Sequence, residues 1–142
     1  MQLVDVHHIG HAVTDLDAAI ATYERLLGAR CEHRETVPGQ GVEAASMLVG
    51  SDRVELLAPL GEDTPVGRFL AKRGPGMHHI AYRVEDIQRS LDEAAGSGAE
   101  LIDATPRVGL FGLLVAFIHP DSVDGVLVEL VQPPTNGARD HG

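Results

Sequence analysis

Two pairs of adjacent histidines, and two glutamates inside apolar segments, are the residues of this sequence that could do chemistry together. The pair His7–His8 begins the text HHIGHAVTDL, and the pair His78–His79 begins the similar text HHIAYRVEDI. Glu55 lies in the apolar segment VELLAP, and Glu129 lies in VELVQP. The chain therefore carries the same combination of histidine and glutamate twice, which is the pattern of an internal repeat.

Such a combination predicts a divalent metal site. A carboxylate buried without a partner is costly, so Glu55 and Glu129 each need a cation, a proton or strong hydrogen-bond donors. Imidazole and carboxylate together suit Co, Mn, Ni, Fe or Zn, and four ligands leave positions on an octahedral ion for a chelating substrate. Strand alternation allows either histidine of each pair to face the ion. A single such glutamate often faces solvent and a single such histidine is often a core residue, but the duplication favours the metal site.

The segments around these residues predict two βαβββ modules. Strands in the first module are expected at 3–13, 29–37, 42–49 and 53–58, with a helix capped by Thr14 and Asp15 and ended by Gly28. Strands in the second are expected at 77–84, 101–104, 113–119 and 126–131, with a helix at 85–96. A half of about 70 residues buries too little core to fold alone.

We therefore expect one domain at 1–133. It contains module 1 at about 3–60, a connector helix at about 64–73 that opens with Thr64 and Pro65, and module 2 at about 76–133. Residues 134–142 have no pattern and are expected to be a disordered tail.

Composition excludes several classes of function. The content of 44% hydrophobic and 23% charged residues is that of a globular protein in solution, and no apolar run reaches the length of a membrane span. The formal net charge of −10 argues against nucleic acid and anionic membranes as partners. A single cysteine, Cys31, excludes an internal disulfide and agrees with a reducing compartment, so we expect a cytoplasmic protein.

Four stretches of the chain resemble a known family. They are HHIGHAV with TDLDAAIATYERLLGA, then VELLAPLGEDTPVGRFLAKRGPGMHHIAYRVEDI, and HPDSVDGVLVELVQ. From about Leu3 to Pro133 the chain resembles the vicinal oxygen chelate (glyoxalase-like) superfamily and, within it, the methylmalonyl-CoA epimerases. The resemblance implies an α+β fold in which two tandem βαβββ modules form a curled mixed sheet around a central metal cleft. By the same resemblance the metal ligands are His8, Glu55, His79 and Glu129.

The implied activity is inversion of the α-carbon of an acyl-CoA thioester such as methylmalonyl-CoA, through an enolate that a divalent metal stabilises. A base on each face of the carbon takes and returns the proton. Glu129 and Glu43 are the predicted catalytic residues. Some epimerases carry a catalytic glutamate where this chain has Ala44, and Glu43 beside it points to the opposite face unless the strand contains a bulge.

The resemblance also implies partners. An acyl-CoA needs cationic side chains for its phosphates, and Lys72, Arg73 and Arg107 are the available ones. A homodimer is expected, because it is common for this architecture. The loop PRVGLFGLL, at Pro106–Leu114, replaces small and polar family residues with apolar ones, which predicts an apolar mouth of the site or a dimer contact.

Two other functions remain open from the sequence. One is a glyoxalase-type lyase or isomerase of the same superfamily that acts on a metabolite without CoA, which Ala44 and the apolar loop favour. The other is a metal-free protein that sequesters a small molecule, which would not need two buried glutamates. An extradiol dioxygenase is disfavoured, because its Fe(II) site uses one carboxylate rather than two.

Overall fold

The computed structural model describes residues 1–134 and divides the chain into two compact units. The first unit is His8–His78, and the second unit combines Met1–His7 with the chain from His79 onward. Two strands cross this division: β1 (Asp5–Ala12) contributes its first residues to the second unit, and β5 (Gly76–Arg83) contributes its first residues to the first unit. That the two units form the single domain expected at 1–133 stays a prediction. Apart from Pro134, the predicted tail lies outside the described residues.

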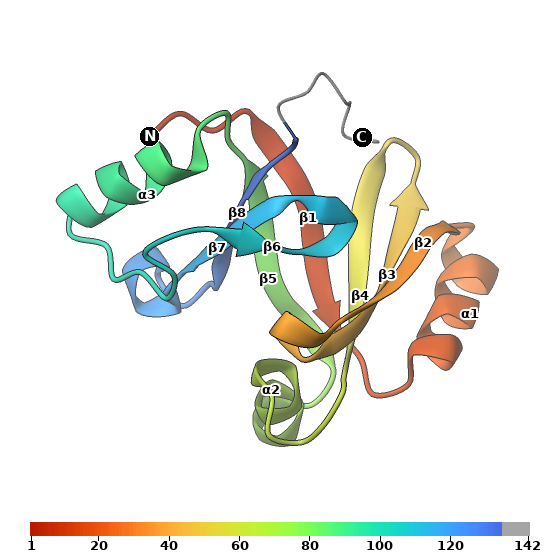
Figure 1. Cartoon of the computed structure of the whole chain (residues 1–142). Coiled ribbons are helices and arrows are strands. Elements are labelled where there is room, and N and C mark those ends of the chain that lie inside the picture. Colours follow the sequence, from red (N-terminus) through yellow and green to blue (C-terminus); the bar gives the residue numbers. More distant parts are fainter. Residues whose placement is uncertain (135–142) are drawn as a thin grey trace. The chain divides into compact units, whose positions relative to one another are not determined.

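The first unit has the predicted order of a βαβββ module (Figure 1). After β1 come α1 (Leu16–Leu27), β2 (Arg30–Val37), β3 (Val42–Val49), β4 (Asp52–Pro59) and the connector helix α2 (Pro65–Arg73). Its strands lie in the order β2-β3-β4-β1, with β1 parallel to β4 and the other pairs antiparallel. The segment PGQG, expected as a turn, forms a 3-10 helix at Pro38–Gln40.

Helix α1 begins and ends at the residues that the sequence indicates. The Asp15 side chain accepts a hydrogen bond from the amide of Ala18 at 3.0 Å, and Gly28 adopts a left-handed conformation (φ 63°) that stops the helix. The apolar side of α1 covers one face of the sheet and closes a core of mostly small and aliphatic side chains. This core contains Val13, Leu16, Ala29, Ala45, Met47, Leu56 and Ala58, with Cys31 packed against it.

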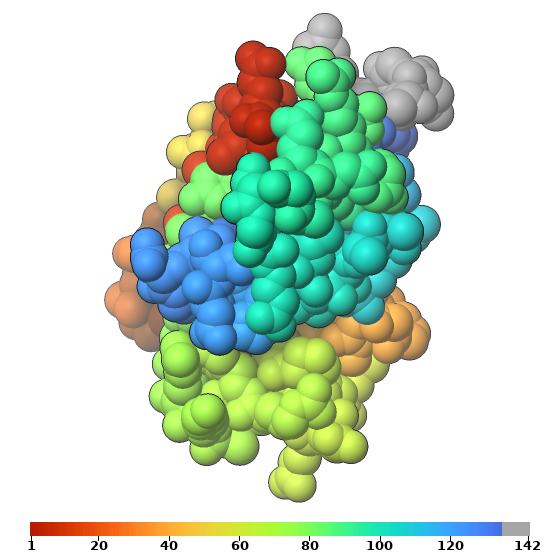
Figure 2. Space-filling model, turned by 90° about the vertical axis from the view of Figure 1, so that its left-hand side faces the viewer, coloured from red at the N-terminus to blue at the C-terminus, as the bar shows by residue number. Residues whose placement is uncertain are grey.

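The second unit repeats the order. After β5 come α3 (Ile87–Gly96), the short strand β6 (Arg107–Val108), β7 (Leu114–Ile118) and β8 (Val128–Gln132), with 3-10 helices at Leu110–Gly112 and Pro120–Val123. Its strand order is β5-β8-β7-β6, with β5 parallel to β8 and the other pairs antiparallel. Figure 2 looks onto α3 and the segment after it, which form the outer surface of this unit.

Helix α3 covers one face of its sheet as α1 does. Its buried side chains, among them Ile87 and Leu91, pack on Ala116, Ile118 and Leu130. Each sheet therefore has one face closed by its own helix, and the alternate residues of the strands form the other face. Among the described residues, no helix is both long and apolar enough to cross a membrane.

The strand predicted at 101–104 is the one element of the second module that the structure contradicts. Only an isolated bridge between Leu101 and Ile118 forms there. The amides of Ile102 and Asp103 both donate to the carbonyl of Phe117, and the Asp103 carboxylate accepts from the Phe117 amide at 2.9 Å. Because a side chain takes the place of a backbone acceptor, the ladder stops, and the edge strand β6 begins instead at Arg107.

Candidate metal centre

The first unit places His8 beside Glu55. Strand β1 runs parallel to β4 with Gly10 opposite Glu55, so His8, two residues before Gly10, shares the face of Glu55. The His8 Nε2 atom lies 3.5 Å from Oε2 of Glu55, and both side chains are buried. This contact identifies His8 as the member of its pair that faces the glutamate. Burial alone would not have done so, because His7 is buried too.

The second unit places His79 beside Glu129 in the same way. Ala81 lies opposite Glu129 in the parallel pair of β5 and β8, and His79 is two residues before Ala81. Its Nε2 atom lies 3.0 Å from Oε1 of Glu129. His78, the other member of the pair, is half-buried, and its ring lies edge-on against Phe69 of α2 with ring centroids 5.0 Å apart.

The two units therefore repeat the same site geometry as well as the same sequence pattern. In each unit the glutamate pairs with the residue two positions after the histidine, on the sheet face that the helix does not cover. Glu55 is 8% exposed and Glu129 is 4% exposed, so the negative charge of each carboxylate is removed from bulk water. A buried carboxylate next to an imidazole is stabilised by a proton on the imidazole or by a cation that both groups bind.

The donor atoms of these pairs fit a divalent metal. Each unit offers an imidazole nitrogen and a carboxylate oxygen from rigid strands, and these donors suit ions of intermediate hardness.

A charged network lies next to Glu55 on the same face of the first unit. Arg53, two residues before Glu55 in β4, donates through Nε to Oε2 of Glu32 at 2.6 Å, and the hydroxyl of Ser46 donates to the same oxygen at 2.6 Å. Ser46 is opposite Glu55 in the ladder of β3 and β4. Arg53 is buried, and the Glu32 carboxylate compensates its charge. The network joins β2, β3 and β4 beside the His8–Glu55 pair.

Glu43, a predicted catalytic residue, lies on the opposite face. Strands β3 and β4 pair without a register shift from Val42 to Val49, so Glu43 and Ala44 point to opposite sides, and Ala44 shares the face of Ser46 and Glu55. The Glu43 carboxylate binds Nε of Arg34 at 3.0 Å, and Arg34 also binds Asp17 of α1 at 2.6 Å. These ion pairs raise the pKa of the Arg34 guanidinium above its ordinary value. The catalytic role of Glu43 stays a prediction, and it would have to act from the side of α1.

A third His–Glu contact, not singled out by the sequence, lies on the edge strand β2. Nε2 of His33 is 2.8 Å from Oε1 of Glu35, and Glu35 is opposite Ala44 in the ladder of β2 and β3. Both side chains therefore share the face of Glu55. A signal was available in the sequence: a hairpin closed around PGQG pairs Val37 with Val42, which in turn sets Glu35 opposite Ala44.

Apolar side chains surround His79 and Glu129 in the second unit. The ring of Phe117, which is opposite Glu129 in the ladder of β7 and β8, lies edge-on against His79 with centroids 5.7 Å apart. A cluster on the same face contains Ala81, Leu113, Val115 and Val131, with Phe111 packed against it. The guanidinium of Arg107 lies over the ring of Phe117, 6.0 Å from its centroid.

The apolar loop is thus divided between the two faces of the second unit. Phe111 and Leu113 belong to the cluster near Glu129, whereas Leu114 packs against the core under α3. The position of Phe111 and Leu113 agrees with the apolar mouth predicted for the site.

Of the cations expected for CoA, Lys72 and Arg73 lie in the last turn of α2, and Arg73 lies over the ring of Phe69.

Comparison with known proteins identifies relatives over nearly the whole chain. Residues 7–117 match the model of the Glyoxalase/Bleomycin resistance protein/Dioxygenase superfamily. An ethylmalonyl-CoA/methylmalonyl-CoA epimerase of Cereibacter sphaeroides is 40% identical over 129 residues, which cover 89% of this chain and 96% of the relative.

Solved structures give the same result. The methylmalonyl-CoA epimerase of Mycobacterium tuberculosis is 37% identical with a TM-score of 0.89, covering 93% of this chain and 89% of that one. A variant of the Streptomyces coelicolor methylmalonyl-CoA epimerase in complex with 2-nitronate-propionyl-CoA is 35% identical with a TM-score of 0.90, covering 94% and 100%. The α+β fold of two tandem βαβββ modules expected from the sequence is confirmed, and the chain belongs to the Glyoxalase/Bleomycin resistance protein/Dioxygenase superfamily and, within it, to the methylmalonyl-CoA epimerases.

Proposed function

We propose that this chain is a metal-dependent epimerase that inverts the α-carbon of an acyl-CoA such as methylmalonyl-CoA. The observation that carries the proposal is the buried His–Glu contact that recurs at the same register in both units. It occurs in a chain 40% identical to an epimerase named for methylmalonyl-CoA and ethylmalonyl-CoA. The acyl group is therefore expected to be a short malonyl derivative.

The metal ligands in this proposal are His8, Glu55, His79 and Glu129. The first two come from one unit and the last two from the other, so the proposal requires one ion shared between the units. His8, His79 and Glu129 form a group that could hold a metal ion. A divalent ion such as Co, Mn, Ni, Fe or Zn would supply positive charge to the oxygen that becomes negative when the α-proton leaves.

The chain itself must move the proton and position the acyl group. Glu129 is the proposed base for one face of the α-carbon, because its carboxylate lies among the apolar side chains that would contact an acyl group. The cluster with Phe111 and Leu113 would exclude water from the sheet face of the second unit that carries Glu129. Arg107 and the pair of cations at the end of α2 are the proposed partners of the CoA phosphates.

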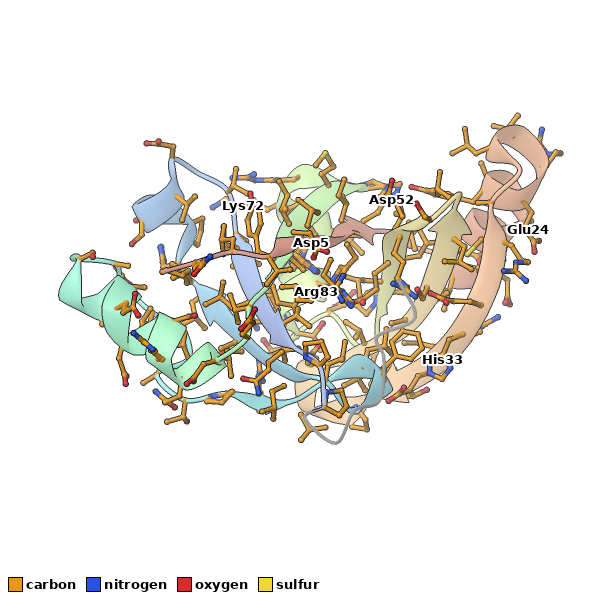
Figure 3. All side chains as sticks on the ribbon, turned by 90° about the horizontal axis from the view of Figure 1, so that it is seen from above. Asp5, Glu24, His33, Asp52, Lys72 and Arg83 are labelled. Carbon is orange, nitrogen blue, oxygen red and sulfur yellow. The ribbon has the colours of Figure 1, made fainter. Side chains whose placement is uncertain are left out.

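The experiment that tests this function follows the α-proton of methylmalonyl-CoA by NMR in D2O, with Co(II) or Mn(II) added. We expect deuterium exchange and inversion by the wild type, and we expect Glu129→Ala to lose both by at least about 100-fold. Glu24→Gln, on the outer side of α1 (Figure 3), is the matched carboxylate control and should behave as the wild type. Absence of exchange in the wild type with either ion would refute the proposed activity.

Metal content separates a shared ion from two independent ones. A shared ion predicts one divalent ion per chain by elemental analysis, and loss of that ion in both His8→Gln and Glu129→Ala, although the two residues belong to different units. Two ions per chain, or an unchanged content in either variant, would contradict the shared site. A protein that binds no divalent ion would instead support the sequestering function.

The glyoxalase-type alternative keeps one observation in its favour, the apolar cluster that includes Phe111 and Leu113. It predicts turnover of a metabolite without CoA and no exchange on methylmalonyl-CoA.

We further propose that the protein is a homodimer and lies in the cytoplasm. Light scattering of the purified protein would test the oligomeric state, and fractionation of cells would test the location.

A further inference from the structure

Glu129, the proposed base, has one neighbour on each side across the sheet. Strand β8 lies between β5 and β7 (Figure 1), with Ala81 of β5 and Phe117 of β7 directly opposite Glu129. Side chains at opposite positions point to the same face, and their Cβ atoms are about 5 Å apart. An α-carbon that gives its proton to Glu129 carries its substituent one bond away, so that substituent must lie close to this row of three side chains.

Of the two neighbours, Phe117 is the one that can touch a ligand. The Ala81 side chain is fully buried and offers no surface, and the next members of the apolar cluster, Val115 and Val131, are buried as well. Phe117 is only half-buried, although it lies among such neighbours. An aromatic side chain that keeps exposed surface beside the proposed base is available to an apolar group of the substrate.

Contacts on several sides hold the Phe117 ring in place. The ring lies edge-on against His79, with an interplanar angle of 90°, and the Arg107 guanidinium lies over it. The backbone is fixed as well, because the Phe117 amide donates to the Asp103 carboxylate at 2.9 Å and its carbonyl accepts from the Asp103 amide at 3.2 Å. A ring held in this way is a fixed wall beside Glu129 and does not readily turn away from a larger group.

We infer that Phe117 contacts the substituent on the α-carbon of the acyl group and limits its size, which makes Phe117 a specificity-determining residue. The inference rests on the proposed epimerase function with Glu129 as the base. A short alkyl substituent such as methyl or ethyl gains an apolar contact with the ring, whereas each further methylene must displace the ring or the acyl group. The substrate class is therefore a malonyl thioester with a short α-alkyl group.

The test measures kcat/KM for methylmalonyl-, ethylmalonyl- and propylmalonyl-CoA with Co(II) present. In the wild type we expect a fall of at least about 10-fold from ethyl to propyl. Phe117→Leu, which has the smaller side chain, should raise the ratio of propyl to methyl by about 10-fold or more. The matched control is Ile118→Val, because Ile118 is the next residue of β7 and lies on the opposite face, in the core under α3. This control should keep the ratio of the wild type.

The ratio separates a substrate contact from a supporting role. If the ring only supports His79 or the fold, Phe117→Leu lowers kcat/KM for all three substrates by the same factor, and an unchanged ratio overturns the inference. A wild type that accepts propyl as readily as ethyl overturns it too. A wild type that turns over none of the three substrates overturns the proposed function, and the inference with it.

A measurement on the unaltered protein decides the question if Phe117→Leu does not fold. The chain has three phenylalanines, so a deuterated protein with protonated phenylalanine gives few ring signals, and Phe69→Leu and Phe111→Leu identify those of the other two rings. With Zn(II) and methylmalonyl-CoA that is isotope-labelled in its α-methyl group, we expect a nuclear Overhauser effect between this methyl group and the Phe117 ring. Absence of the effect in a sample that carries out epimerisation would overturn the inference and leave the function intact.

Discussion

His11 shows how one side chain connects a helix to the sheet. It lies on the α1 side of β1, and its Nδ1 atom is 2.6 Å from the hydroxyl of Tyr23. Burial lowers the pKa of the His11 imidazole below its ordinary value of 6.5, because the charged form loses hydration. The neutral ring that accepts the hydrogen bond from Tyr23 is therefore the form that the fold prefers.

This preference predicts a pH dependence of stability. The unfolded chain binds a proton at His11 at a higher pH than the folded chain, so the His11 contribution is complete above pH 6.5 and is lost as the pH falls below that value. We expect His11→Gln to cost about 1 kcal/mol at about pH 8 through the lost hydrogen bond, and to show a smaller loss of stability between about pH 6.5 and pH 5. Urea unfolding at several pH values measures both, and identical pH slopes in the two proteins would contradict the role of His11.

The histidine pairs and the glutamates show which residues of the site the sequence alone could predict. The two glutamates could be named because each interrupts an apolar strand. Two-residue periodicity leaves the choice between His7 and His8 open; the family resemblance indicated His8, and the register of β1 with β4 places it on the face of Glu55. The opposite orientation of Glu43 could be anticipated from alternation, whereas the pairing of Glu35 with Ala44 needed the hairpin register.

At the scale of elements, the helix boundaries were predictable and one strand was not. Asp15, Gly28 and Thr64 mark their helix ends through caps that depend on local sequence. The segment 101–104 has the composition of a strand, but the Asp103 side chain occupies the backbone amide of Phe117. That contact joins residues distant in sequence, so composition could not reveal it.

Helix α2 contains a glycine whose small size is required. A Cβ at Gly67 would lie 2.7 Å from the carbonyl oxygen of Glu62 and closer still to that of Gly61, and the Gly67 amide donates to the capping Thr64 hydroxyl at 3.0 Å. We expect Gly67→Ala to displace the start of α2 from the preceding turn and to lower the free energy of unfolding by about 2 kcal/mol.

The matched control is Gly96→Ala at the end of α3, where a Cβ would meet nothing within 4 Å. There the reduced freedom of the unfolded chain should leave stability unchanged or raise it by about 0.5 kcal/mol. Thermal or urea unfolding measures both variants. Equal effects of the two substitutions would mean that the turn at Gly61 can shift at little cost in free energy, which would contradict the need for a glycine at position 67.

At the scale of the whole molecule, a shared ion should make the two units unfold together. A divalent ion at about 100 times its dissociation constant stabilises the state that binds it by about 2.7 kcal/mol. We expect one calorimetric transition whose midpoint rises with Co(II) and falls with a chelator, and we expect His8→Gln to abolish this response. Two transitions, of which only one responds to metal, would place the ion in a single unit and would contradict the predicted single domain.

The division of β1 has a consequence for how the chain is made. The first seven residues belong with the part of the chain that begins at His79, where the Val4 amide donates to the Arg83 carbonyl at 2.9 Å and Asp5 binds the Arg83 guanidinium at 2.8 Å (Figure 3). The partners of these residues are translated only after the entire first unit. During synthesis Val4 and Asp5 therefore remain without these contacts until the segment that contains Arg83 has been made.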